Sequence, residues 1–61
     1  MSAGILSSED VAERYQVPLR TVIGWRAKRT GPSYFRAGRY VRYRLSALLE
    51  WEAAEELKAA S

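Results

Sequence analysis

The sequence predicts a small α+β domain, mainly α, in which two short helices are followed by a β-hairpin and a third helix. Apolar residues recur at helical spacing up to Lys28, the apolar period changes from 3.6 to 2 after Pro32, and helical spacing returns after Ser46. A chain of 61 residues has the length of one domain. We therefore expect a single domain over residues 1–61, with an ordered core from about residue 5 to residue 57.

The first helix is predicted by a pattern at its start. Ser7 is followed three residues later by Asp10, which resembles a capping box with Asp in place of the usual Glu. A helix is expected from about Ser8 to Tyr15. Its apolar residues Val11 and Tyr15 lie on one narrow stripe, so this helix must pack against neighbouring elements.

A second helix is expected from about Leu19 to Lys28. Pro18 disfavours helical geometry at the preceding residue and is itself suited to a helix start, so Gln16-Val17-Pro18 forms a three-residue turn. Val22 and Trp25 are three apart and point inward. Two short helices joined by such a turn are typical of a helix-turn-helix, and the second would be the recognition helix. The opposite side of this helix carries Arg20, Gly24, Ala27 and Lys28.

A β-hairpin is expected next, because apolar and polar residues alternate on both sides of Gly38. We place its turn at Ala37-Gly38-Arg39, where the glycine can take the positive φ of a tight turn. In this arrangement Phe35, Val41 and Tyr43 share the side that packs on the helices. The hairpin then projects as a wing with arginines on its polar side and at its tip, namely Arg36, Arg42 and Arg44 on the side and Arg39 at the tip.

Ser46 is expected to cap a third helix from about Ala47 to Leu57. Leu45, Leu48 and Trp51 supply its core-facing group. A second apolar stripe lies on another side of the same helix, and it exceeds what one small core requires. The stripe predicts a candidate protein-contact surface made of Leu49, Ala53 and Leu57.

The charges are strongly polarised along the chain. The net charge is +3, yet eight of the ten Lys and Arg residues lie between Leu19 and Arg44, a segment without an acidic residue. The acids precede and follow this segment, with Glu9, Asp10 and Glu13 before it and four glutamates after it. One face of the molecule should therefore meet a polyanion.

The composition excludes several classes of site. The chain has no Cys and no His, which removes disulfides, thiolate chemistry, imidazole catalysis and the usual zinc sites. The carboxylates lie on predicted surface helices without a pocket for acid–base chemistry, so we expect neither catalysis nor a cofactor nor a metal. No apolar run approaches the ~20 residues of a membrane span, and we expect a cytoplasmic protein without a membrane partner.

Four pieces of the sequence together resemble a known family. They are Leu6 to Tyr15, Val17 to Val22 with Trp25, Gly31-Pro32 through Arg39 to Tyr43, and Ser46 to Leu48 with Trp51. In this order they look like the MerR-like winged helix-turn-helix of phage and mobile-element excisionases, also called recombination directionality factors. The resemblance implies a DNA-binding domain that places its second helix in the major groove and its hairpin wing in an adjacent minor groove.

The resemblance also implies a function. Excisionases bind several adjacent direct repeats on attachment DNA, associate head to tail, bend the DNA and direct a partner integrase toward excision. The expected partners are then double-stranded DNA, neighbouring copies of the same protein and the integrase of a phage or mobile element, in the cytoplasm and at the nucleoid of a bacterial host. Two alternatives stay open: a small transcriptional regulator that binds promoter or operator DNA, and an interaction module of phage assembly.

Candidate DNA contacts fall on two elements. On the second helix they are Leu19, Arg20, Thr21, Ile23, Gly24, Arg26 and Lys28, and on the wing they are Arg36, Gly38, Arg39, Tyr40 and Arg42. Arg20 is suited to a bidentate contact with guanine, with a phosphate contact as the alternative, and Arg39 is suited to a narrow minor groove. Arg26 and Lys28 are assigned to phosphates. Gly24 has two interpretations, which are close approach of the backbone to DNA and a position without any contact.

Overall fold

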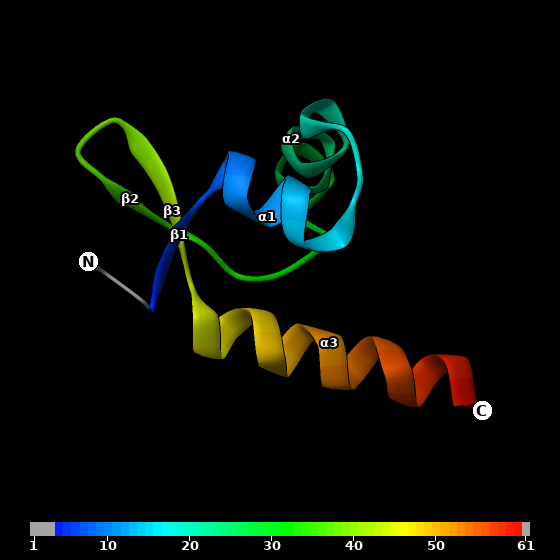
Figure 1. Cartoon of the computed structure of the whole chain (residues 1–61). Helices are drawn as coiled ribbons and strands as arrows, with labels where there is room; N and C mark the ends of the chain where they lie inside the picture. Colours follow the sequence, from blue (N-terminus) through cyan, green and yellow to red (C-terminus); the bar gives the residue numbers. More distant parts are fainter. Residues whose placement is uncertain (1–3, 61) are drawn as a thin grey trace.

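The computed structural model of the chain describes residues 4–60, and within them a strand, two helices, a hairpin and a third helix follow one another (Figure 1). Their bounds are β1 Ile5–Ser7, α1 Ser8–Tyr15, α2 Leu19–Lys28, β2 Phe35–Ala37, β3 Tyr40–Arg44 and α3 Leu45–Ala60. This is a small winged helix-turn-helix, so the predicted fold class is confirmed. The predicted domain also included residues 1–3 and 61, which lie outside the described residues.

α1 begins with the predicted capping box. The Ser7 Oγ accepts a hydrogen bond from the Asp10 N–H at 3.1 Å, and the Asp10 Oδ2 accepts one from the Ser7 N–H at 3.1 Å. The helix ends at Tyr15, and the next residue, Gln16, has a left-handed backbone (φ 55°) that lets its N–H reach carbonyls of the last turn. Each end of this short helix therefore satisfies backbone groups, which fixes its bounds at the predicted residues.

α2 has the bounds predicted for it and follows a three-residue turn. The Val17 N–H donates to the Ala12 carbonyl at 3.0 Å, so the turn folds back against α1. Val22 is fully buried and Trp25 is half-buried, which confirms the predicted inward side. α1 and α2 thus form the expected pair of helices (Figure 1).

Within the described residues the sheet has three antiparallel strands in the order β1-β3-β2. The sequence pattern does not predict β1, because a three-residue strand is too short to show alternation. It pairs with the end of β3 that is far from the turn, with Leu6 opposite Tyr43 and Ile5 opposite Arg44. Leu6 and Tyr43 face the core, so Ile5 and Arg44 lie on the outer face. β1 therefore attaches the base of the wing to the start of α1.

The register of the hairpin corrects the predicted one. The observed pairs are Ala37 with Tyr40, Arg36 with Val41 and Phe35 with Arg42. The turn is two residues long instead of three, and a shift of one residue moves side chains to the other face. Phe35 lies on the outer face with Arg42, so the prediction that it packs on the helices is wrong. Arg36 lies on the side of Val41, so the prediction that it shares a side with Arg42 is also wrong.

α3 begins at Leu45, directly after β3 and earlier than predicted. The N–H of Leu45 donates to the Gly4 carbonyl at 2.8 Å, so a backbone group satisfies this donor at the start of the helix. Ser46 lies inside the first turn, and the prediction that it caps α3 is wrong. At its other end α3 continues to Ala60, further than predicted.

The core lies between the inner face of the sheet and the helices. Its buried residues are Val11, Ala12, Val22, Tyr43 and Leu48. The partly buried residues packed around them are Leu6, Tyr15, Val17, Trp25, Val41 and Leu45. Burial of Tyr43 and Leu48 confirms the predicted inward sides of β3 and α3.

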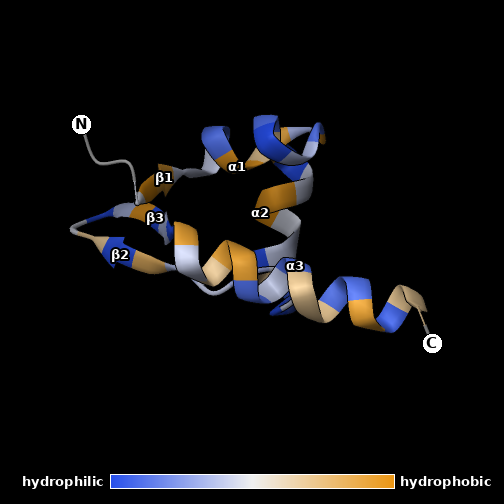
Figure 2. Cartoon of the chain, turned by 60° about the horizontal axis from the view of Figure 1, so that its bottom comes forward, coloured by the Kyte–Doolittle hydropathy of each residue, from blue (hydrophilic) through white to orange (hydrophobic). Residues whose placement is uncertain are grey.

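An aromatic cluster of Tyr15, Trp25 and Trp51 holds α3 against α1 and α2. The ring centroids are 5.2 Å apart for Trp25 and Trp51, and 5.4 Å apart for Tyr15 and Trp51. Gly31 packs on this cluster, because a Cβ there would lie 3.0 Å from Trp25 atoms, and its φ of 78° also favours glycine. The residues from Ala53 to Ala60 are all exposed, so the second half of α3 projects from the body (Figures 1 and 2).

Candidate nucleic-acid interface

One side of α2 faces away from the core. It lies opposite Val22, which is fully buried. This outer side presents one guanidinium among small or apolar groups, and its members are Arg20, Ile23, Gly24 and Ala27. Lys28 is exposed next to it, and Thr21 is half-buried at its edge. The outer side predicted from helical spacing is therefore confirmed.

Gly24 has no role in packing the protein itself. A Cβ added at this position would meet nothing within 4 Å, and its φ lies outside the left-handed region. Neither internal packing nor backbone geometry requires glycine here. The interpretation that DNA approaches the backbone at Gly24 therefore stays a prediction, with no competing explanation inside the fold.

Arg26 is engaged inside the protein, which the sequence did not indicate. Its Nη1 donates hydrogen bonds to the Ser8 Oγ at 2.9 Å and to the Tyr43 hydroxyl at 3.1 Å. Its guanidinium also lies 5.8 Å from the centre of the Tyr34 ring. Arg26 thus ties α2 to the start of α1 and to β3.

Three of the four arginines of the wing lie against aromatic rings. Gly38 has φ of 67°, typical of the first central residue of a type II′ turn, and Arg39 follows it at the tip. The guanidinium groups of Arg39 and Arg42 lie 5.5 and 5.4 Å from the centre of the Tyr40 ring, and that of Arg44 lies 5.1 Å from the centre of the Phe35 ring. Such contacts restrict the arginine side chains before any partner binds. Arg36 is exposed, and Arg42 is half-buried.

A hollow of about 270 Å³ separates α2 from the wing. Leu19 and Ile23 line it from α2, Arg39 and Tyr40 line it from the wing, and Ser8, Glu9, Arg26, Val41 and Arg42 complete it. The structure therefore brings together candidate residues from both elements that the sequence could only assign separately. Because the hollow combines arginine and apolar side chains, it is suited to an anionic ligand that also has apolar groups on its surface.

Comparison with known protein families assigns this chain to a family. Residues 5–58 match a family model described as a helix-turn-helix domain, which covers most of the chain. The chain belongs to the helix-turn-helix domain family. A search among curated proteins found no match to it. Family membership indicates DNA binding, with α2 as the second helix of the motif.

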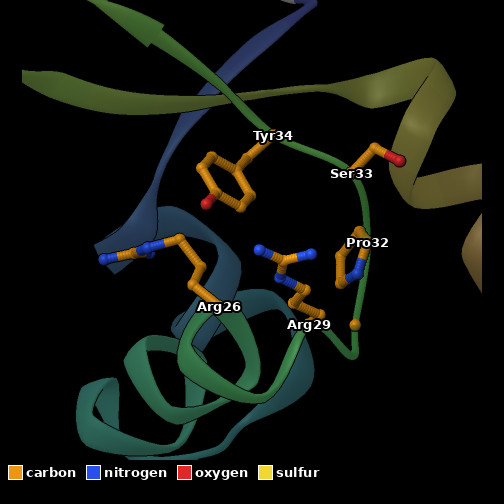
Figure 3. Close-up of a pocket in the computed structure, with 6 residues that line it drawn as sticks. Arg26, Arg29, Pro32, Ser33 and Tyr34 are labelled. Carbon is orange, nitrogen blue, oxygen red and sulfur yellow. The ribbon is translucent and has the colours of Figure 1, made fainter.

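A second hollow of this helix-turn-helix domain is basic. It lies between the end of α2 and the segment that leads to β2, and it measures about 430 Å³. Its lining residues are Arg26, Arg29, Gly31, Pro32, Ser33 and Tyr34. Figure 3 shows the Arg29 side chain reaching from the end of α2 toward Pro32 and Tyr34. The Arg29 guanidinium placed in this way is suited to an anionic oxygen such as that of a phosphate.

Away from both hollows, a polar network links α1 to α3. Glu52 Oε2 accepts hydrogen bonds from the Arg14 Nε at 2.8 Å and from the Tyr15 hydroxyl at 2.6 Å. Burial and the bond to Glu52 raise the pKa of Tyr15 to about 12. The bonds from Arg14 and Tyr15 hold the pKa of Glu52 below its usual value, and the bond to Glu52 raises the pKa of Arg14. Sequence spacing gives no signal for these contacts, because α1 and α3 are distant along the chain.

Residues 4–60 contain no cluster of three or more acidic side chains that could hold a metal ion. None of the helices in that same part of the chain has the length and apolar character needed to cross a membrane.

Proposed function

We propose that this helix-turn-helix protein is a sequence-specific double-stranded DNA-binding excisionase. It binds repeated sites on attachment DNA, bends the DNA and directs the integrase of a phage or mobile element toward excision. The observation that carries the DNA-binding part is the cationic hollow between α2 and the wing. The residues that line this hollow and the second, basic one come from elements other than α3, which carries the glutamates that follow the basic segment.

In this proposal α2 enters the major groove and the wing enters an adjacent minor groove. Arg20, in the first turn of α2, pairs with the N7 and O6 of a guanine. Arg39 inserts into a narrow minor groove, where the negative potential is concentrated. Lys28 and Arg29 neutralise phosphates at the other end of α2. Arg26 keeps α2 and the wing at the angle that both contacts need.

The α3 stripe supplies the proposed contact between neighbouring copies. It contains Leu49, which is 50% exposed, together with Ala53 and Leu57, and Figure 2 shows hydrophobic and hydrophilic bands along α3. A domain this small makes few DNA contacts, so adjacent copies gain affinity through effective concentration. Copies bound to direct repeats all point the same way along the DNA, so the proposal requires a head-to-tail arrangement that does not close, in place of a symmetric dimer.

In this proposal the protein carries out no catalysis and needs no cofactor or metal, since its role is to bend DNA and to bind a partner. It operates in the cytoplasm of a bacterial host and at the nucleoid when bound. The integrase would then perform all covalent steps on the DNA.

Selection of bound duplexes from a random pool tests the proposal. The enriched duplex is footprinted, and its mobility is compared with the binding site at the middle and at the end of a longer fragment. Tandem direct repeats that are occupied cooperatively and bent would support an excisionase. An inverted repeat would indicate a dimeric transcriptional regulator instead, and failure to enrich any duplex would favour a protein-interaction module.

A further inference from the structure

Two apolar side chains are exposed where α2 is expected to meet DNA. Ile23 is 47% exposed and Leu19 is 38% exposed, and both line the hollow between α2 and the wing. Water covers these surfaces in the free protein, so contact with an apolar group of a partner would be favourable. Gly24 and Ala27 are the small residues beside Ile23 on the outer side, so a partner can approach α2 closely there.

The charges around these side chains identify the chemistry of the partner. Arg20 lies on the same side of α2, and Arg39 and Arg42 line the same hollow. Glu9 also lines this hollow, so the cations are in excess. The fitting partner is therefore an anionic surface that carries isolated apolar groups. The major groove of DNA has this character, because phosphates border it and the 5-methyl group of thymine projects into it.

We propose that Ile23 contacts the 5-methyl group of a thymine in the major groove, with Leu19 extending the same apolar surface toward the wing. This inference rests on the proposed DNA-binding function and adds the class of base that α2 recognises. Arg20 and Ile23 are neighbours on one side of the helix. The recognised site therefore holds a guanine and a thymine within reach of the first two turns of α2.

The test uses the duplex enriched from a random pool of synthetic, unmethylated DNA, which makes thymine the source of any pyrimidine 5-methyl group. Each thymine is replaced in turn by deoxyuridine, which removes one methyl group and keeps base pairing. With the full chain, we expect affinity to fall about fourfold at one or two thymines, the amount expected for uncovering one methyl group. Replacement of the remaining thymines should leave affinity unchanged.

Two variants assign the effect to Ile23. Ile23→Ala should bind the thymine and uracil duplexes equally, whereas Ile23→Val should keep most of the preference because it retains branched methyl groups. Since Ile23 is half exposed and Ala favours helix, Ile23→Ala should unfold at or near the wild-type temperature. Thermal unfolding measured on the same samples shows that the binding difference does not come from misfolding.

The outcomes separate this inference from the proposed function. A uracil effect of the same size in wild type and in Ile23→Ala would overturn the contact with Ile23. A bound duplex in which every thymine tolerates uracil would overturn it as well, while leaving DNA binding established. Failure to enrich any duplex would overturn the DNA-binding function and this inference together.

Discussion

The fold itself does not require a glycine at position 24. The fold has open space for a Cβ there, in contrast to Gly31, where a Cβ would collide with Trp25. A glycine in a helix interior is less stable than alanine by roughly 1 kcal/mol. Gly24 therefore weakens α2 at the centre of the side that is expected to face DNA, and close approach of the helix backbone to a base pair would give this glycine a function.

We expect Gly24→Ala to raise the stability of the protein and to weaken its binding to DNA. The stability gain should be roughly 0.5–1 kcal/mol, which raises the melting temperature of a domain this size by about 4–8 °C per kcal/mol. Thermal unfolding and gel shifts on the enriched duplex measure the two effects. A variant that is more stable and binds as tightly as wild type would show that DNA makes no close contact at this position.

At the scale of elements, the predictable features were those that neighbouring residues encode. The bounds of α1 follow from Ser7 and Asp10, and the start of α2 follows from Pro18, so both helices were placed correctly. The register of the hairpin depends on whether Ala37 ends a strand or begins the turn. The alternation of side chains allows both. The prediction that Ala37 belongs to the turn therefore placed Phe35 on the inner face, whereas it lies on the outer face with Arg42.

Prediction of the candidate site from the sequence was limited in the same way, to features that one element determines alone. Helical spacing identified the outer side of α2, because that depends on α2 alone. It did not show that Arg26 bonds to Ser8 and Tyr43, since these partners come from two other elements. For the same reason it missed that Glu52, one of the acids expected on a free surface, joins α3 to α1. Charge patterning thus identified a basic segment but could not show which of its arginines, such as Arg26, bond to other elements of the fold.

The network of Arg14, Tyr15 and Glu52 predicts how stability depends on pH. Tyr15 keeps its proton to about pH 12 in the folded protein, whereas the unfolded chain loses it from about pH 10, so stability falls between these values. Glu52 has a lowered pKa, so its contribution is present above pH 4.5 and is lost as the pH falls through its folded value. Melting temperatures from pH 3 to pH 12 measure both limbs.

Two substitutions assign the alkaline limb to Tyr15. Tyr15→Phe removes the titrating hydroxyl, so the fall in melting temperature between pH 10 and pH 12 should be smaller than in wild type. Tyr40→Phe is the matched control, because Tyr40 is 54% exposed and lies on the wing. It should keep the wild-type slope. Equal slopes in all three proteins would exclude the bond between Tyr15 and Glu52 as the origin of the limb.

At the scale of the whole molecule, the polarised charge predicts two kinds of loss of DNA affinity when a cationic residue is replaced, one that depends on the DNA sequence and one that does not. Lys28→Ala should weaken binding to all duplexes alike and lower the dependence of log affinity on log salt by about 1, because it removes one phosphate contact. Arg20→Ala should cost about 1–3 kcal/mol on the enriched duplex and much less on a random one. Both residues are exposed, so thermal unfolding should be unchanged. A loss for Arg20→Ala that is equal on both duplexes would make it a phosphate contact.

Self-association would also be a property of the whole molecule, and in the proposed function it depends on the α3 stripe of Leu49, Ala53 and Leu57. Leu49→Glu places a charge in the exposed apolar stripe, where a neighbouring copy would have to bury it without a partner. We expect binding to a duplex with one repeat to be unchanged and cooperative binding to tandem repeats to be lost. Gel shifts on duplexes with one and two repeats measure this difference.

The matched control is Ala59→Glu, which introduces the same charge at an exposed position of α3 outside the stripe of Leu49, Ala53 and Leu57. It should keep cooperative binding, because it leaves the stripe intact. Both variants change the net charge of the protein equally, so any general repulsion from DNA should be similar in the two. Loss of cooperativity in both variants would assign the effect to charge alone. Retention in both would mean that neighbouring copies meet through another surface or through the shape of the bent DNA.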